Sequence, residues 1–196
     1  MAPIRSFADL DPTRTYTYAD YLTWQLTEWV ELVRGRIRRM SPAPTTLHQR
    51  VSSNLHSLIG PYLRRKTCQV FAAPFDVRLT TRGGNGADDA ITTVVQPDLC
   101  VICDPAKLDQ RGCLGSPDWI IEILSPGTAG RDMDEKFTLY EESGVGEYWI
   151  VAPGEQNISV FVLEDDHYRL VGDYWQPGPV PVRTLPELVV EWGDVF

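Results

Sequence analysis

No apolar run in the 196-residue chain reaches the roughly 18 residues that a transmembrane helix requires. The amino-terminal segment MAPIRSFADLDPTR also lacks the charged-then-apolar order of a secretory signal. We therefore expect a protein that does not enter the membrane and lies in the cytoplasm. No repeat, linker or low-complexity tract divides the sequence, and 43% hydrophobic residues suffice for one core, so residues 1–196 are predicted to form a single domain.

Cysteine is scarce as well, with four residues: Cys68, Cys100, Cys103 and Cys113. Without an export signal, reduced and mostly buried thiols are expected rather than disulfides. Cys100 and Cys103 stand an odd number of residues apart in an expected strand, and therefore point to opposite faces. Because no second CxxC motif or nearby histidine pair accompanies them, the sequence argues against a structural zinc site.

An overall positive charge is absent, since the net charge is −9 and the pI is about 4.8, which argues against non-specific coating of nucleic acid. The charge is unevenly distributed. Residues 1–82 hold 12 Lys or Arg against 6 Asp or Glu, whereas residues 83–196 hold 6 against 21. The basic residues cluster as Arg34, Arg36, Arg38 and Arg39 in RGRIRR, and as Arg64, Arg65 and Lys66 in RRK. Solvated surface patches are the simpler interpretation, and contacts to a phosphate backbone are the alternative.

The hydrophobic spacing predicts a mixed α and β chain. Helices are expected at residues 16–26, 44–66 and 131–143, the last ended by Gly144. Strands are expected at 68–80, 97–103, 118–124 and 147–153, with hairpins at 29–40 and 157–174. The helix and hairpin at about 16–40 would lead into the core, and the Gly-, Asn- and Asp-containing segment 81–93 would be a loop bordering a binding site.

Glu122 poses the main chemical question, because it lies in the apolar stretch WIIEIL. A carboxylate removed from water costs several kcal/mol unless it is paired, hydrogen-bonded or bound to metal. Asp98 begins the preceding expected strand, so two neighbouring strands would bring both carboxylates to one sheet edge, where Mg²⁺ would offset their charge. Lys136 follows on a helix. Its ammonium either forms a surface ion pair with Asp132, four residues earlier, or points back over the strand ends.

Five segments occur in a characteristic order along the chain: YTYADYLTW, VELVRGRIRRMSPAPTTLHQRV, QPDLCVICD, SPDWIIEILSPGT and RDMDEKFTLYEESGVGEYWIVAP. In their order and spacing, the chain resembles the Uma-two-type restriction endonuclease family, a branch of the PD-(D/E)XK nuclease superfamily. The resemblance covers most of the chain. It implies an α/β (α+β), restriction-endonuclease-like fold, with a central mixed β-sheet flanked by helices.

The resemblance also implies roles for individual residues. Asp98 would be the PD aspartate, Glu122 the second acidic metal ligand, and Ile123 a ligand through its backbone carbonyl. Glu31 matches an early acidic position beside the site. The superfamily pattern places a lysine two residues after Glu122, but this chain has Leu124 there. In the family that the chain resembles, the lysine lies on the following helix, and Lys136 matches that position. Asp132 matches the acidic residue one turn earlier, and His48 matches a histidine at the start of the long helix, in an accessory or merely packing role.

These residues lead to two hypotheses. The first is an endonuclease that depends on Mg²⁺, with Mn²⁺ as a substitute, and cleaves DNA bound through the basic clusters, with a homodimer as the expected assembly. The second is a non-catalytic module of the same fold, acting in dimerisation, nucleic-acid binding or regulation, in which Glu122 and Lys136 form a buried ion pair. A dinucleotide-binding domain is disfavoured because RGGNGADD lacks the GxGxxG spacing. Ser125 and Thr128 are expected to cap the following helix rather than to act as nucleophiles.

Overall fold

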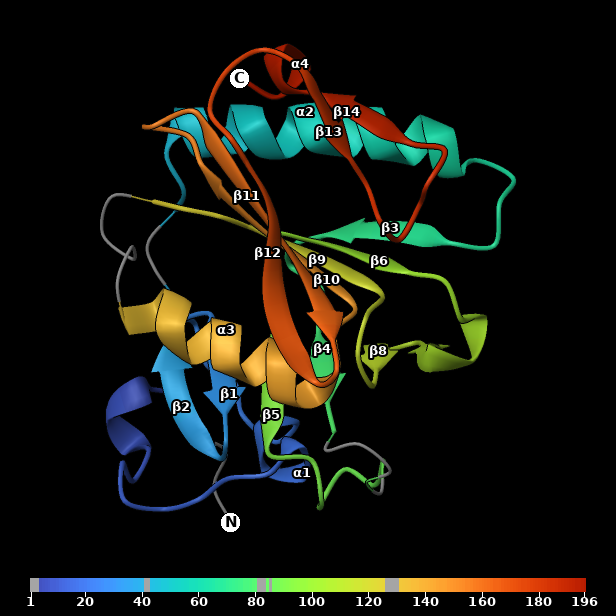
Figure 1. Cartoon of the computed structure of the whole chain (residues 1–196). Helices are drawn as coiled ribbons and strands as arrows, with labels where there is room; N and C mark the ends of the chain where they lie inside the picture. Colours follow the sequence, from blue (N-terminus) through green and yellow to red (C-terminus); the bar gives the residue numbers. More distant parts are fainter. Residues whose placement is uncertain (1–3, 41–42, 81–83, 85, 126–130) are drawn as a thin grey trace.

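Two six-stranded sheets organise the chain, as the computed structural model in Figure 1 shows. The structure describes residues 4–40, 43–80, 84, 86–125 and 131–196. Within these residues, no helix combines the length and apolar character needed to cross a bilayer. The mixed α and β composition and the central mixed sheet agree with the prediction, and a second six-stranded sheet accompanies the central one.

The central sheet contains the strands predicted at 97–103 and 118–124. Its order is β12-β11-β10-β9-β6-β3, and only β9 and β10 pair in parallel. The strand bounds are β3 Gln69–Ala72, β6 Leu99–Ile102, β9 Trp119–Ile123, β10 Glu147–Ala152, β11 Asn157–Glu164 and β12 His167–Tyr174. The predicted hairpin at 157–174 is confirmed. The predicted pairing of the strands that carry Asp98 and Glu122 is confirmed as well, because β6 and β9 are antiparallel neighbours.

The second sheet has the order β2-β1-β5-β4-β8-β7. Its bounds are β1 Val30–Val33, β2 Arg36–Arg39, β4 Val77–Leu79, β5 Thr93–Val95, β7 Leu108–Asp109 and β8 Gly112–Leu114. The hairpin predicted at 29–40 is confirmed as β1–β2, and it turns at Arg34 and Gly35, both with positive φ. The predicted single strand at 68–80 was wrong: β3 and β4 belong to different sheets. Pro74 lies between them and has no N–H to donate to a ladder, so the strand is interrupted there.

Of the four helices in the described part of the chain, the two long ones, α2 and α3, lie on opposite sides of the central sheet (Figure 1). The four are α1 Tyr18–Tyr21, α2 Thr46–Leu63, α3 Arg131–Ser143 and α4 Trp192–Val195. Short 3₁₀ segments span Phe7–Asp9 and Pro105–Lys107, and a small ribbon pairs β13 Pro179–Pro181 with β14 Val189–Glu191. Figure 1 shows α2 on one side of the central sheet, with α3 and the second sheet on the other. The prediction for α3 is confirmed, and Gly144 with φ 85° follows it.

The amino-terminal helix is shorter than expected. Residues 16–26 were predicted to be helical, but α1 has one turn, which Thr17 and Asp20 cap reciprocally. Beyond it, the Gln25 N–H donates to the Ile4 carbonyl (2.8 Å), so this part of the chain bonds to the amino-terminal segment instead of continuing the helix. A hydrogen bond to a distant segment has therefore prevailed over the helical spacing of the apolar residues in 16–26.

Helix α2 forms the long amphipathic element predicted at 44–66, although its bounds are narrower. Thr45 caps it by accepting from the His48 N–H, and the helix continues past Pro61 to Leu63. Its apolar stripe, which consists of Val51, Leu55, Ile59 and Leu63, is buried against the central sheet together with Trp119 and Trp149. Because of this packing, the amino-terminal end of α2, which carries His48, lies near the carboxyl end of β9.

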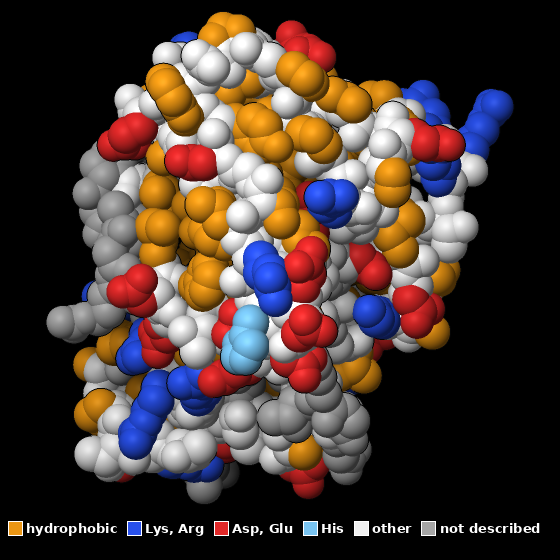
Figure 2. Space-filling model, viewed as in Figure 1, with side chains coloured by type: hydrophobic (Ala, Val, Ile, Leu, Met, Phe, Trp, Pro, Cys, Tyr) orange, Lys and Arg blue, Asp and Glu red, His pale blue; other side chains and the backbone are white. Residues whose placement is uncertain are grey.

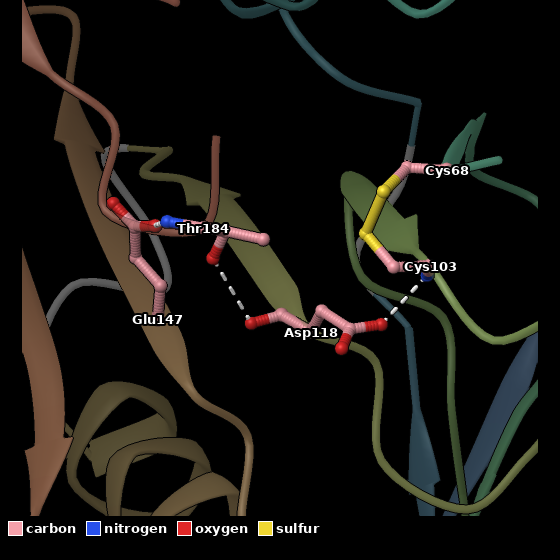
Figure 3. The surroundings of a disulfide bond; sticks show 5 residues. All are labelled: Cys68, Cys103, Asp118, Glu147 and Thr184. Atoms are coloured by element: carbon pink, nitrogen blue, oxygen red, sulfur yellow. Dashed lines mark hydrogen bonds between the residues drawn. A yellow bond between two sulfur atoms is a disulfide. The ribbon is translucent and has the colours of Figure 1, made fainter. Parts of the chain in front are cut away.

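The cysteines correct one expectation. Cys68 and Cys103 form a disulfide (Figure 3), whereas reduced thiols were predicted. The reason is the antiparallel register of β3 and β6: Gln69 pairs with Ile102, which places Cys68 and Cys103 opposite each other one step further along. Cys100 and Cys113 are free and buried, as expected. Cys100 and Cys103 do face different cores, which confirms their predicted separation.

Candidate active site

Asp98 and Glu122 meet where β6 begins and β9 ends. Leu99 pairs with Ile121 in the antiparallel register, so Asp98 stands directly opposite Glu122. Asp98 Oδ2 accepts from the Ile123 N–H (2.7 Å), which fixes the carboxylate against the end of β9. The sequence prediction that these carboxylates converge at one sheet edge is therefore confirmed.

Lys136 reaches this edge from α3. Its Nζ lies 2.9 Å from Glu122 Oε1 and 3.1 Å from Glu31 Oε1. All three side chains are at most 20% exposed, so this is a largely buried ion cluster and not a surface pair. The ammonium joins a carboxylate of the central sheet to a carboxylate of the second sheet. The alternative partner weighed from sequence, Asp132, has a side chain that lies outside the described residues, as does the whole of Thr128.

The electrostatics of the cluster follow from its burial. Burial, together with the nearby charges of Asp98 and Glu31, raises the pKa of Glu122 to about 7, although Lys136 and the hydrogen bond from Tyr140 act in the opposite direction. For Lys136, burial lowers the pKa, but the attraction of Glu122 and Glu31 outweighs it and holds the pKa above its ordinary value. Lys136 is therefore charged at neutral pH, and Glu122 is poised to exchange a proton there.

Tyr140 completes the surroundings of Glu122, although the sequence did not single it out as a site residue. Its buried hydroxyl donates to Glu122 Oε1 (2.6 Å), the same oxygen that Lys136 contacts. The other carboxylate oxygen, Glu122 Oε2, receives no hydrogen bond from a described residue. The available signal was the spacing: Tyr140 follows Lys136 by four residues and so shares its helix face.

Glu31 is held by a second set of contacts that the sequence did not reveal. The Gln96 N–H donates to Glu31 Oε1 (2.9 Å), and Gln96 Nε2 donates to Asp76 Oδ1 (2.8 Å). Burial raises the pKa of Asp76, and the hydrogen bond from Gln96 offsets part of this rise. Gln96 immediately precedes the Pro97-Asp98 motif, which was the only local sign of its place beside the site.

His48 also lies at the site. Its Nε2 is 3.2 Å from Asp98 Oδ1, the side chain is 8% exposed, and Nδ1 has no hydrogen-bond partner among the described residues. Burial lowers the pKa of His48, but the adjacent Asp98 carboxylate and the charge of Glu122 together raise it more, so that the net shift is upward. The structure thus brings His48 to Asp98, while its role stays a prediction.

The two basic clusters lie in different parts of the structure, one on the β1–β2 hairpin beside α3 and the other at the carboxyl end of α2. The hairpin arginines face acidic partners: Arg38 donates to Glu135 through two nitrogens (2.8 and 3.1 Å), and Arg34 contacts Glu142 at 2.6 Å. Figure 2 shows basic and acidic side chains interspersed on the face in view, without a continuous basic surface. The RRK cluster begins at Arg64, 16 residues after His48. At 1.5 Å per residue it lies about 24 Å along α2 from the site.

The donor set suits a hard divalent cation. Asp98 and Glu122 supply carboxylates at the carboxyl end of β9, and Glu122 Oε2 has no donor among the described residues. In the described part of the chain, no three His, Cys, Asp or Glu side chains form a ready-made metal site. Mg²⁺ is commonly held by one or two carboxylates, with water and phosphate in the remaining positions, so these residues fit it.

Comparison with known proteins places this geometry in a family. The model of the Uma2 family, described as "Putative restriction endonuclease", matches residues 18–192. The chain belongs to the Uma2 family. The match includes every residue of the site, from Glu31 to Tyr140. The resemblance seen in the sequence is therefore confirmed.

The chain is also similar to two curated proteins and, in fold, to one solved structure. The chain is 27% identical over 165 residues to "Uncharacterized protein sll1609" of Synechocystis sp. (strain ATCC 27184 / PCC 6803 / Kazusa), covering 82% of this chain and 84% of the relative. It is 24% identical over 187 residues to "Uncharacterized protein slr1290" of the same strain, covering 94% and 90%. A crystal structure of "a putative nuclease belonging to DUF820" from Anabaena variabilis ATCC 29413 has a TM-score of 0.70 at 21% identity, covering 92% of this chain and 97% of that one. The restriction-endonuclease-like fold expected from the sequence is confirmed.

Proposed function

We propose that this Uma2-family chain is a divalent-metal-dependent endonuclease that hydrolyses DNA phosphodiester bonds. One observation carries the proposal: Asp98 and Glu122 meet at one strand edge, and the buried Lys136 bridges Glu122 to Glu31 of the other sheet. Burying this much charge from separate elements lowers the stability of the fold, and such clusters are typical of sites where the charged groups perform chemistry. The family description and the fold support a nuclease.

Asp98, Glu122 and the Ile123 carbonyl would hold Mg²⁺, or Mn²⁺ in its place. A divalent ion there supplies Lewis acidity toward the phosphate and a water of lowered pKa. Lys136 and Tyr140 both contact Glu122 Oε1, and thereby direct Oε2 toward the ligand position. Lys136, held charged by Glu31, would stabilise negative charge developing on the phosphate.

The alternative, a non-catalytic module of the same fold, has a specific observation in its favour. Lys136 already forms a closed ion cluster with Glu31 and Glu122, and two hairpin arginines are paired with acids of α3. In a purely structural protein the same contacts would hold the two sheets together. The two proposals differ in whether metal binds and whether a phosphodiester is cleaved.

The test is cleavage of supercoiled and single-stranded DNA with Mg²⁺, with Mn²⁺ and with EDTA. Wild type, Glu122→Gln and the matched control Glu142→Gln, which changes an exposed carboxylate of α3, are purified in parallel. Metal-dependent nicking by wild type and control but not by Glu122→Gln supports the endonuclease. Equal nicking by all three indicates a contaminant or a misassigned site.

A negative result is informative too. If none of the three proteins cleaves DNA, and neither metal raises the melting temperature of wild type, the non-catalytic module is favoured. Light scattering on the same preparations tests the expected homodimer, since cutting both strands of a duplex commonly takes two copies.

A further inference from the structure

Trp29 is an exposed tryptophan next to the site. Its relative exposure is 62%, whereas Trp119 and Trp149 are completely buried. No described residue forms an aromatic stacking contact or a cation contact with its indole ring. A single exposed apolar side chain is unremarkable in itself. The place of Trp29 in the hairpin gives it significance.

The strand geometry puts Trp29 on the same side of the hairpin as Glu31. The Trp29 carbonyl accepts from the Met40 N–H (3.0 Å), so the β1–β2 ladder extends to this residue. Side chains two residues apart in a strand share a face, at about 6.5 Å between their Cα atoms. Trp29 is therefore one step beyond Glu31, on the face where Glu31 meets Lys136.

The partner of this face can be inferred from chemistry. On the opposite strand β2, Arg38 pairs with Glu31 and so lies on the same face as Trp29, where it also contacts Glu135 of α3; Arg39 pairs with Val30 and lies on the other face. An exposed aromatic ring beside an arginine and the Lys136 ammonium suits a nucleic-acid strand, whose bases stack on the ring while its phosphates meet the positive charge. A protein partner would use the ring equally well but would gain nothing from its closeness to Glu31 and Lys136.

We propose that Trp29 stacks on an unpaired nucleobase next to the phosphate bound at the Glu122–Lys136 site. The inference rests on the proposed nuclease function and deepens it, because a base can cover the indole only when it is free of its complementary strand. The substrate class is then single-stranded nucleic acid, or the unpaired part of a branched one, in DNA or RNA. Stacking of this kind tolerates any base.

The experiment uses fluorescence anisotropy of labelled oligo-dT and oligo-U strands and of a DNA duplex, in EDTA so that binding is measured without cleavage. The variants are Trp29→Ala, Trp29→Phe and the matched control Trp175→Ala. Trp175 is 66% exposed and follows β12, which is three strands from β9, or about 14 Å across the sheet. We expect Trp29→Ala to weaken single-strand binding roughly 5- to 150-fold. Trp29→Phe should restore most of it, Trp175→Ala should change it less than twofold, and duplex binding should be unaffected.

The outcomes separate this inference from the proposed function. If wild type binds single strands and both alanine variants match it, stacking by Trp29 is refuted while the nuclease proposal stands. If Trp29→Ala instead converts a dimer to a monomer with single-strand affinity unchanged, the ring is a contact between two copies and the inference is overturned. If wild type neither binds any of the strands nor cleaves DNA with metal, both proposals fail.

Discussion

Replacing Lys136 with methionine tests the energetics of the site. The side chain keeps its approximate length and loses the ammonium that contacts Glu122 at 2.9 Å and Glu31 at 3.1 Å. The three side chains are between 9% and 20% exposed, so water replaces the lost charge poorly. Removing one partner from a buried ion pair typically costs about 3–5 kcal/mol, because the other charge stays buried. We expect a loss of that size in the free energy of unfolding at pH 8.

The assay is urea unfolding followed by circular dichroism, with thermal melts as a second measure. For a chain of this size, the loss corresponds to a melting temperature lower by about 6–20 °C. The matched control is Lys107→Met, since Lys107 Nζ donates to the Ser116 carbonyl (2.8 Å) and forms no ion pair with a carboxylate of the described residues. The double variant Lys136→Met/Glu122→Gln should recover part of the loss, because only the Glu31 charge then lacks its cation.

The pH dependence provides a further check. At pH 5 the deficit of Lys136→Met should shrink, since Glu122 without its cation binds a proton even more readily. A loss below about 1 kcal/mol at pH 8 with an unchanged m-value would refute the reasoning. A double variant less stable than Lys136→Met would refute it as well.

Three further predictions concern the Tyr140 hydroxyl, the titration of Glu122 and the disulfide bond. Tyr140→Phe should cost about 1.5–3 kcal/mol of unfolding free energy, because a hydrogen bond to a carboxylate is lost; the adjacent Tyr148→Phe, whose hydroxyl bonds to no described residue, should cost less than about 1 kcal/mol. The folded-state pKa of Glu122, about 7, exceeds its ordinary value of 4.5. Its stabilising contribution is therefore complete below pH 4.5 and is lost as the pH rises to 7, so wild type should lose up to about 3 kcal/mol relative to Glu122→Gln across that window in paired urea titrations. Reducing the Cys68–Cys103 bond, which closes a loop across 35 residues, should lower the unfolding free energy by about 2–4 kcal/mol in urea titrations with and without dithiothreitol, and the Cys68→Ser/Cys103→Ser variant should show no such difference.

Much of the site followed from local sequence patterns. The apolar stretch around Glu122 required a partner for the carboxylate, and the helical spacing of residues 131–143 correctly placed Lys136 on a helix that follows β9. These features depend on contacts between residues that are close in the sequence. The spacing of apolar residues and the capping residues therefore indicate them directly. The hairpin that carries Glu31 was predictable for the same reason, since Arg34-Gly35 supplies the turn.

Only the tertiary structure decided how these elements meet. The partition into two sheets, the bridge from Lys136 to Glu31 and the opposition of Cys68 and Cys103 depend on strand registers between distant segments. Tyr140 could be recognised as a partner of Glu122 only after α3 had been docked on the central sheet. The same docking gave Arg38 an acidic partner in Glu135. The sequence by itself determined which groups were costly to bury and where the local elements lie; non-local packing chose their partners, because register and docking are set by the burial of whole faces rather than by neighbouring residues.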